Sequence, residues 1–80
     1  MPCLRLFGPA RVAAGTGADQ VEGATVAEVL DGARRRYGAP FDAVLATSTV
    51  WVNGAARPAE FPVGPDDEVA VLPPVSGGAR

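Results

Sequence analysis

The sequence predicts an α+β domain in which one main helix covers one face of a mixed β-sheet. Strand-like alternation of apolar residues occurs near both ends of the 80-residue chain, at Cys3–Gly8 and at Glu68–Leu72. Between them, Val26–Tyr37 carries apolar residues at helical spacing. A chain of this size hides roughly 60% of the surface that its unfolded form exposes, so we expect one domain with a single modest core.

The first strand is expected to bury one of its two faces. Leu4 and Leu6 lie on one side of the alternation, and Cys3, Arg5 and Phe7 lie on the other. The two leucines are therefore assigned to the core. Phe7 is expected to be a large apolar side chain on the uncovered side of the sheet.

Proline and glycine mark the elements that follow this strand. Pro9–Ala14 is predicted to form a short helical turn with proline in the first position, and Gly15 closes it. The segment Asp19–Glu22 is the predicted second strand, and it carries the weakest pattern in the chain.

The main helix has clear start and stop signals. Thr25 and Glu28 have the three-residue spacing of a capping box. Gly38 is expected to supply the left-handed residue that commonly ends a helix, and Pro40 to prevent its continuation. The apolar stripe consists of Val26, Val29, Leu30, Ala33 and Tyr37.

Two strands are predicted in the second half of the chain. Ala43–Thr47 has no clear pattern, whereas Thr49–Val52 has the β-branched and aromatic content of a strand, and we assign its Trp51 to the core. Asn53-Gly54 is a turn signal. Phe61–Val63 is predicted as a very short strand or an extended loop.

The last strand follows the turn Gly64–Asp67. Alternation places Val69 and Val71 in the core and leaves Ala70 and Leu72 outside. If the first and last strands are neighbours, Leu72 and Phe7 together form an apolar patch beside the C-terminal tail.

The C-terminal residues carry the most specific functional signal. Pro73-Pro74 leads through Val75-Ser76 to Gly77-Gly78. Glycine has no Cβ and can thread a channel too narrow for other residues, and proline favours an extended approach to it. We therefore expect a folded domain over residues 1–75 that presents a flexible tail over residues 76–80.

Composition excludes several classes of function. The chain has no histidine and all seven basic residues are arginine, so the commonest general base and any Schiff-base lysine are absent. A net charge of −2 argues against a nucleic-acid partner, and Arg34–Arg36 is interpreted as a set of cations at a helix C-terminus.

The expected location is a reducing cytoplasm, without membrane attachment. No apolar stretch approaches the roughly 20 residues that span a bilayer. The start of the chain lacks the apolar stretch of a secretory signal, and the single Cys3 cannot form an internal disulfide. Cys3 is interpreted as an ordinary small side chain.

The chain resembles the ubiquitin-like sulfur carriers, in particular the small subunit of molybdopterin synthase. The matching motifs are Leu6-Phe7-Gly8 with Arg11 and Gly15, Thr25–Leu30, Val52-Asn53-Gly54, Asp67–Ala70 and Pro73–Gly78. The resemblance covers nearly the whole chain. It implies a β-grasp fold in which the first and last strands lie side by side.

The resemblance also implies a chemistry that partner proteins perform on this chain. The carboxylate of Gly78 would be activated with ATP as an acyl-adenylate on a ubiquitin-activating-like enzyme, and sulfide or a persulfide would then produce a thiocarboxylate. A sulfur-acceptor enzyme, such as the large subunit of molybdopterin synthase, would receive the sulfur. The chain itself would bind no cofactor or metal and would not be an enzyme.

Residue roles follow from the resemblance position by position. Gly78 would bear the sulfur and Gly77 must remain small. Phe7 and Leu72 would contact both partners through apolar surface, and Arg11 would pair with an acidic partner residue; an ordinary solvated arginine is the equally weighted alternative. The tail residues Pro73, Pro74, Val75 and Ser76 are also assigned to partner binding.

The sequence departs from the family pattern at its end. Ala79-Arg80 follows Gly78, so the Gly78 carbonyl is part of a peptide bond. A protease that trims these two residues is the simplest expectation; the alternatives are that they are not native to the protein or that the chain has lost carrier function. Asp66-Asp67 lacks the glycine usual before the second acid, and Ala55-Ala56 is small where a bulkier apolar contact is common.

Three functions remain open from the sequence. The first is a sulfur carrier for molybdenum-cofactor assembly. The second is a carrier for another acceptor, such as thiamine, cysteine or a sulfur-containing natural product. The third is a ubiquitin-like interaction module that is never activated.

Overall fold

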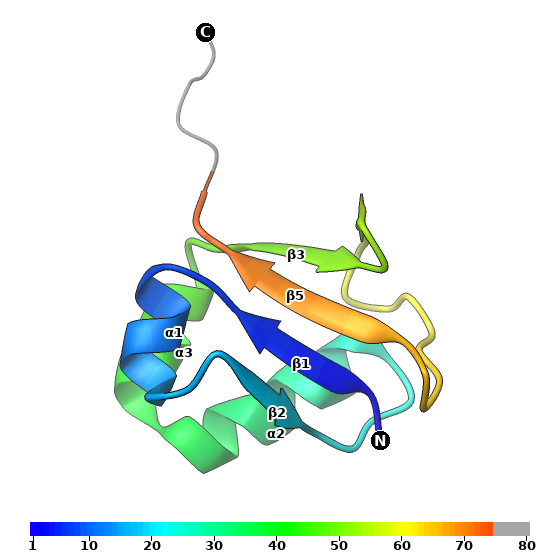
Figure 1. The fold of residues 1–80 in the computed structure, drawn as a ribbon, viewed down its shortest axis with the longest axis horizontal. Helices are drawn as coiled ribbons and strands as arrows, with labels where there is room; N and C mark the ends of the chain where they lie inside the picture. Colours follow the sequence, from blue (N-terminus) through cyan, green and yellow to red (C-terminus); the bar gives the residue numbers. More distant parts are fainter. Residues whose placement is uncertain (75–80) are drawn as a thin grey trace, which may run out of the picture.

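Five strands form one mixed sheet in the order β2-β1-β5-β3-β4, and helices cover one of its faces (Figure 1). The computed structural model describes residues 1–74. The elements are β1 (Cys3–Leu6), α1 (Pro9–Ala14), β2 (Ala18–Gln20), α2 (Val26–Tyr37), α3 (Ala39–Leu45), β3 (Thr49–Val52), β4 (Ala55–Ala56) and β5 (Glu68–Leu72). The predicted α+β class is confirmed. The predicted tail over residues 76–80, and Val75 before it, lie outside the described residues.

The centre of the sheet is the parallel pair of β1 and β5. Leu4 lies opposite Val69 and Leu6 opposite Val71, and all four side chains are at most 1% exposed. The first and last strands are therefore neighbours, as predicted, and their inward alternation holds the middle of the core. Burial of four aliphatic side chains of this size contributes about 1.5–3 kcal/mol each relative to exposure.

The edge strand β2 is shorter than predicted. It pairs with β1 from Ala18 to Gln20, so it begins one residue before the predicted Asp19–Glu22 and ends two residues earlier. Val21 follows the strand. Its N–H donates to Pro2 O (3.2 Å), and its side chain is buried beneath α2, where a Cβ at Gly32 would approach Val21 Cγ1 to 2.7 Å. The missing side chain of Gly32 allows α2 to lie this close to the chain.

Helix α2 begins and packs as the sequence predicts. The Thr25 hydroxyl accepts a hydrogen bond from Glu28 N–H (3.2 Å), and the Glu28 carboxylate accepts one from Ala24 N–H (2.8 Å). The second bond reaches the residue before the N-cap, one position earlier than in the usual capping box. The apolar stripe is buried at Val26, Val29, Leu30 and Ala33 and half-buried at Tyr37.

The helix α3 was not predicted from the sequence. Gly38 has the expected positive φ of 85°, but its ψ of −166° is not that of the left-handed helix, and it turns the chain directly into α3. Pro40 ends α2 and occupies the first turn of α3, where its missing N–H costs nothing. The helix buries Phe41 and Leu45. The proline that stops one helix therefore also starts the next.

Strands β3 and β4 form a hairpin through the predicted turn Asn53-Gly54. The assignment of Trp51 to the core is wrong, because its side chain is 37% exposed. Val52 is buried and Val50 packs against the core, so alternation along β3 directs Trp51 to the opposite face.

The turn before β5 is fastened to this hairpin. The Asp67 carboxylate accepts hydrogen bonds from Gly64 N–H (2.7 Å) and from the Asn53 side-chain amide (2.8 Å). The amide oxygen of Asn53 in turn accepts one from Glu68 N–H (2.9 Å). The bond from Gly64 first, and the bond from the Asn53 amide second, lower the pKa of Asp67. The paired motifs Asn-Gly and Asp-Glu thus form one structural unit.

The arginine run is largely occupied by ion pairs. Arg34 pairs with Asp31 and with Asp42, and Arg36 pairs with Asp19. The interpretation of the run as structural is consistent with these contacts. Within residues 1–74, no helix is both long enough and apolar enough to cross a bilayer.

Asp19 and Tyr37 join β2 to the end of α2. The Tyr37 hydroxyl donates to the Asp19 carboxylate, which also accepts from the Arg36 guanidinium (2.7 Å). The Tyr37 bond first, and Arg36 second, lower the pKa of Asp19. Burial, together with the bond to Asp19, raises the pKa of Tyr37 to about 12.

These shifts predict a loss of stability at alkaline pH. A raised pKa in the folded state contributes stability below the ordinary value of 10.0, and this contribution is lost as pH rises towards about 12. The chain has one tyrosine and no lysine, so Tyr37 dominates titration in this window. We expect urea unfolding to show falling stability across it, and Tyr37→Phe to flatten that fall. An equally steep fall in Tyr37→Phe would contradict the assignment.

Candidate functional site

The face of the sheet opposite the helices is not covered by any described element, and we name it the open sheet face. It consists of Cys3, Arg5 and Phe7 from β1 and its end, Thr49 and Trp51 from β3, and Glu68, Ala70 and Leu72 from β5. Each of these residues alternates with a side chain that packs towards the helices. The open sheet face and the core therefore lie on opposite sides of the same three strands.

Phe7 and Leu72 lie at neighbouring positions at one end of this face. The register pairs Leu6 with Val71, and Phe7 N–H continues the ladder by donating to Val71 O (3.1 Å). The Phe7 side chain is 41% exposed and Leu72 is partly exposed. The structure thus brings together the two apolar residues that the sequence assigned to a patch. Their role in binding stays a prediction.

Trp51 extends the apolar surface across the sheet and was missed as a site residue. It lies opposite Ala70 on β5 and opposite Ala56 on β4, and these small side chains leave its ring unobstructed. The alternation of Val50 and Val52 would have identified its orientation, because two inward valines flank it. The weight given to tryptophan as a core residue hid this signal.

Arg5 occupies the middle of the open sheet face. Its guanidinium pairs with Glu68 (3.1 Å) and lies 5.9 Å from the centre of the Phe7 ring. Both charged side chains are 45% exposed, so the pair contributes little to stability. It does neutralise the charge of this surface, which leaves the aromatic rings as its main feature.

The tail starts at the same end of the sheet as Phe7 and Leu72. Pro73 and Pro74 are exposed, and the Pro73 ring lies against Gly8, where a Cβ would come within 3.4 Å of it. Figure 1 shows the ends of β1 and β5 at this edge. The predicted site residues Val75, Ser76, Gly77 and Gly78 lie outside the described residues.

Arg11 lies on α1 and not on the open sheet face. Its guanidinium lies over Gly17, where a Cβ would be 3.3 Å from Arg11 Cζ, Nε and Nη1. The side chain is exposed and within reach of solvent. The structure places Arg11 close in sequence to Phe7 but on a different element, and its pairing with an acidic partner stays a prediction.

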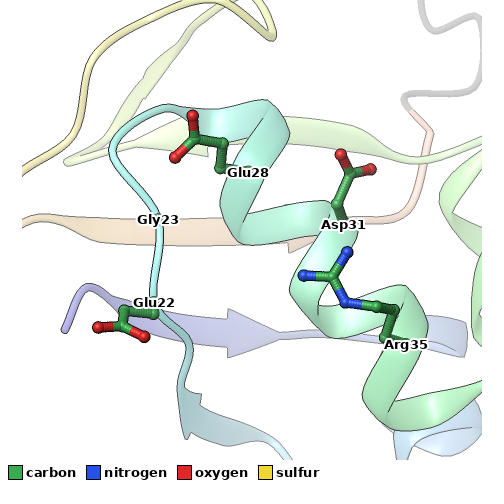
Figure 2. Close-up of a pocket in the computed structure, with 5 residues that line it drawn as sticks. All are labelled: Glu22, Gly23, Glu28, Asp31 and Arg35. Carbon is green, nitrogen blue, oxygen red and sulfur yellow. The ribbon is translucent and has the colours of Figure 1, made fainter.

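A shallow hollow lies on the helical side of the molecule, away from the open sheet face (Figure 2). It has a volume of ≈ 390 Å³ and is lined by Glu22, Gly23, Glu28, Asp31 and Arg35. Glu28 is already engaged in capping α2. Among the described residues there is no group of three or more His, Cys, Asp or Glu side chains able to hold a metal ion.

The polar and charged side chains of residues 1–74 lie at or near the surface of the protein. No polar or charged side chain is buried in this part of the chain. The groups with shifted pKa values, Asp19, Arg36, Tyr37 and Asp67, belong to the structural contacts described above and lie outside the open sheet face. The described residues therefore present exposed apolar side chains beside the start of the tail.

Comparisons with solved structures agree with this architecture. SAMP1 from Haloferax volcanii is 29% identical with a TM-score of 0.81, and the match covers 95% of this chain and 97% of that one. CysO in the BexX/CysO complex of Amycolatopsis orientalis is 22% identical with a TM-score of 0.80 over 98% and 100% of the two chains.

A third structure is a putative molybdopterin converting factor, subunit 1, from Pyrococcus furiosus. It is 24% identical with a TM-score of 0.81, and 91% of this chain and 95% of that chain are covered. At these identities the second and third structures show the fold alone. The fold is the β-grasp, as the resemblance implied.

A search of curated proteins found no significant match. The model of the ThiS family, by contrast, matches residues 4–78 and so covers nearly the whole chain through its second terminal glycine. This chain belongs to the ThiS family of ubiquitin-like sulfur carriers.

Proposed function

We propose that this protein carries sulfur on the carboxylate of Gly78 and delivers it to an acceptor enzyme. The observation that carries the proposal is the family match, which runs from Leu4 to Gly78 and includes both terminal glycines. The open sheet face supports it, because it places exposed aromatic side chains at the root of the segment that would react.

The proposed reaction takes place on a partner enzyme. A carboxylate oxygen of Gly78 attacks the α-phosphorus of ATP, pyrophosphate leaves, and an acyl-adenylate forms. Sulfide then attacks the acyl carbon and AMP leaves, so that one oxygen of the carboxylate is replaced by sulfur. The adenylate is needed because a bare carboxylate is a poor acyl donor.

The proposed division of labour fits the residues of this chain. The adenylating enzyme binds ATP and catalyses its reaction, and this protein contributes the carboxylate that reacts and a surface for docking. The chain therefore needs no histidine, no lysine and no bound cofactor of its own. We accordingly infer that it acts as a carrier and not as an enzyme.

The Gly78–Ala79 bond must be hydrolysed before this chemistry can begin. In the sequence, Gly78 is followed by Ala79-Arg80, and a peptide carbonyl has no carboxylate oxygen to attack ATP. We infer that a processing protease removes these residues.

Our first candidate for the acceptor is the large subunit of molybdopterin synthase, which the ending Pro73–Gly78 favours. The second candidate is an acceptor in another pathway, such as thiamine, cysteine or natural-product biosynthesis. The need to remove Ala79-Arg80 favours this second candidate. Assays of sulfur transfer to each acceptor separate the two.

The central chemical prediction is a change of mass at the C-terminus. A chain ending at Gly78, incubated with a cognate adenylating enzyme, ATP and sulfide, should gain the mass expected for replacement of one oxygen by sulfur. The matched control is the 80-residue chain, which has the same body and should show no gain. Intact-mass spectrometry measures both.

Two results would count against this proposal. A chain ending at Gly78 that never gains the mass would favour the interaction module that is not activated. A gain of equal size in the 80-residue chain would show that the sulfur is not carried on Gly78.

Substitutions on the open sheet face should weaken docking to the adenylating enzyme. In the chain ending at Gly78, Phe7→Ala and Trp51→Ala should each raise the KM for the carrier on the order of tenfold, with kcat little changed, since exposed aromatic side chains commonly dominate interfaces. Val12→Ala is the control, because Val12 is 82% exposed but lies on α1. Pyrophosphate release measures the kinetics.

Urea unfolding of each variant keeps the comparison fair. Both aromatic side chains are exposed, so their removal should leave most of the stability intact. An increase in KM for Val12→Ala equal to that for Phe7→Ala and Trp51→Ala would exclude the open sheet face as the docking surface.

A further inference from the structure

Strands β1 and β5 end on the same side of the sheet, and the residues that follow them, Gly8 and Pro73, are in contact. The two strands are parallel to each other; β1 ends at Leu6 and β5 ends at Leu72. Beyond the end of β1, Phe7 N–H donates to Val71 O (3.1 Å). The next residue after Phe7 is Gly8 and the next after Leu72 is Pro73. The chain after β1 leads into α1, and the chain after β5 leads into the tail (Figure 1).

Gly8 has a backbone conformation that side chains disfavour. Its φ is 57° and its ψ is −132°, and its carbonyl accepts a hydrogen bond from Val12 N–H (3.2 Å) as α1 begins. A non-glycine residue is strained at this positive φ. The sharp turn from β1 into α1 therefore requires a residue without a Cβ.

The Pro73 ring occupies the space beside the missing side chain of Gly8. A Cβ on Gly8 would lie 3.4 Å from Pro73 Cγ, 3.5 Å from Cδ and 3.7 Å from Cβ. A methyl group would thus be in van der Waals contact with the ring, and we expect the branch carbons of a larger side chain to press against it. The fixed φ of proline makes this contact directional, because displacing the ring redirects the chain beyond it.

We propose that Gly8 is a positioning residue that seats Pro73 and so sets the direction in which the tail leaves the sheet. This inference rests on the proposed function and deepens it. The open sheet face docks the body, and the contact between Gly8 and Pro73 aims the segment that leads to Gly78. Aim matters for the reaction, because misplacing a reacting group by about 1 Å can cost on the order of 100-fold in rate.

Two variants remove the seat in different ways. Gly8→Val adds two branch carbons beyond the Cβ and displaces the Pro73 ring. Pro73→Ala removes most of the ring and leaves Gly8 unchanged, and because Pro73 is exposed it poses little risk to folding. Gly15→Val is the matched control: Gly15 ends the same helix at a φ of 77°, but a Cβ there meets nothing within 4 Å.

The direct readout is the direction of the chain at Pro74. One-bond Cα–Hα residual dipolar couplings, measured in a weakly aligning medium, report the orientation of Pro74 relative to the sheet. We expect Gly8→Val and Pro73→Ala to change the Pro74 coupling while the couplings within β1 and β5 stay constant. Gly15→Val should leave the Pro74 coupling unchanged.

The functional readout is the split between kcat and KM for adenylation of chains ending at Gly78. We expect Gly8→Val and Pro73→Ala to lower kcat on the order of tenfold, because the aim of the tail is lost. For Gly8→Val the KM should stay within about twofold of the unsubstituted chain, since Gly8 has no assigned contact with the partner. The KM of Pro73→Ala is left out of this test, because Pro73 is itself assigned to partner binding. Gly15→Val also places a side chain at a positive φ, although Gly15 is in the left-handed helical region and Gly8 is not, and it should keep both constants.

Each contrary result has a distinct meaning. A Pro74 coupling that changes no more in Gly8→Val and Pro73→Ala than in Gly15→Val would overturn the proposal that the contact between Gly8 and Pro73 sets the direction of the chain. A changed coupling with kcat unaltered would overturn its role in aiming the tail. If the unsubstituted chain ending at Gly78 is not adenylated at all, the proposed function fails, and the dipolar couplings alone still decide whether Gly8 directs the chain.

Discussion

The parallel pairing of β1 with β5 is the constraint on which the rest of the molecule depends. It buries Leu4, Leu6, Val69 and Val71 at the centre of the core. Since side chains alternate along a strand, the same pairing sends Arg5 and its neighbours to the open sheet face. A slip of one residue would exchange the buried and exposed sets, so the core fixes the register and the register fixes which side chains form the open sheet face.

The same pairing also brings the start of the tail to the open sheet face. Because the two strands are parallel, Phe7 and Leu72 emerge at one edge, and the tail starts there as well. Parallel strands need a long connection, and here the chain from α1 to β4 provides it, with its helices covering the other face (Figure 1). The contacts of Asp19 with Tyr37 and Arg36, and of Asp67 with Asn53, hold the edges of this arrangement. These side chains lie outside the open sheet face.

Much of this fold could be predicted from the sequence, because local signals and tertiary packing agree there. The strands at both ends, the Thr25 cap and the main helix all follow from short-range patterns. The neighbouring positions of Phe7 and Leu72 follow from the pairing of the first strand of the chain with the last. In each case the periodicity of burial matched the intrinsic preference of the residues.

The errors occurred where one residue has two physical roles. Pro40 stops a helix, but it is equally suited to the first turn of α3, which propensity alone did not reveal. Trp51 belongs to a residue type that is usually buried, yet the alternation of β3 directs it outward. The close approach of α2 to Val21 at Gly32 is a tertiary contact, and it has no local signal in the sequence.

The indole N–H signal of Trp51 is the sharpest test of whether the open sheet face and the start of the tail form one docking unit. The chain has a single tryptophan, so this signal is unambiguous in the isotope-labelled protein. On addition of unlabelled adenylating enzyme to a chain ending at Gly78, we predict that the Trp51 signal shifts or broadens while the amides of α2 do not. Perturbation of α2 with an unchanged Trp51 signal would contradict the account.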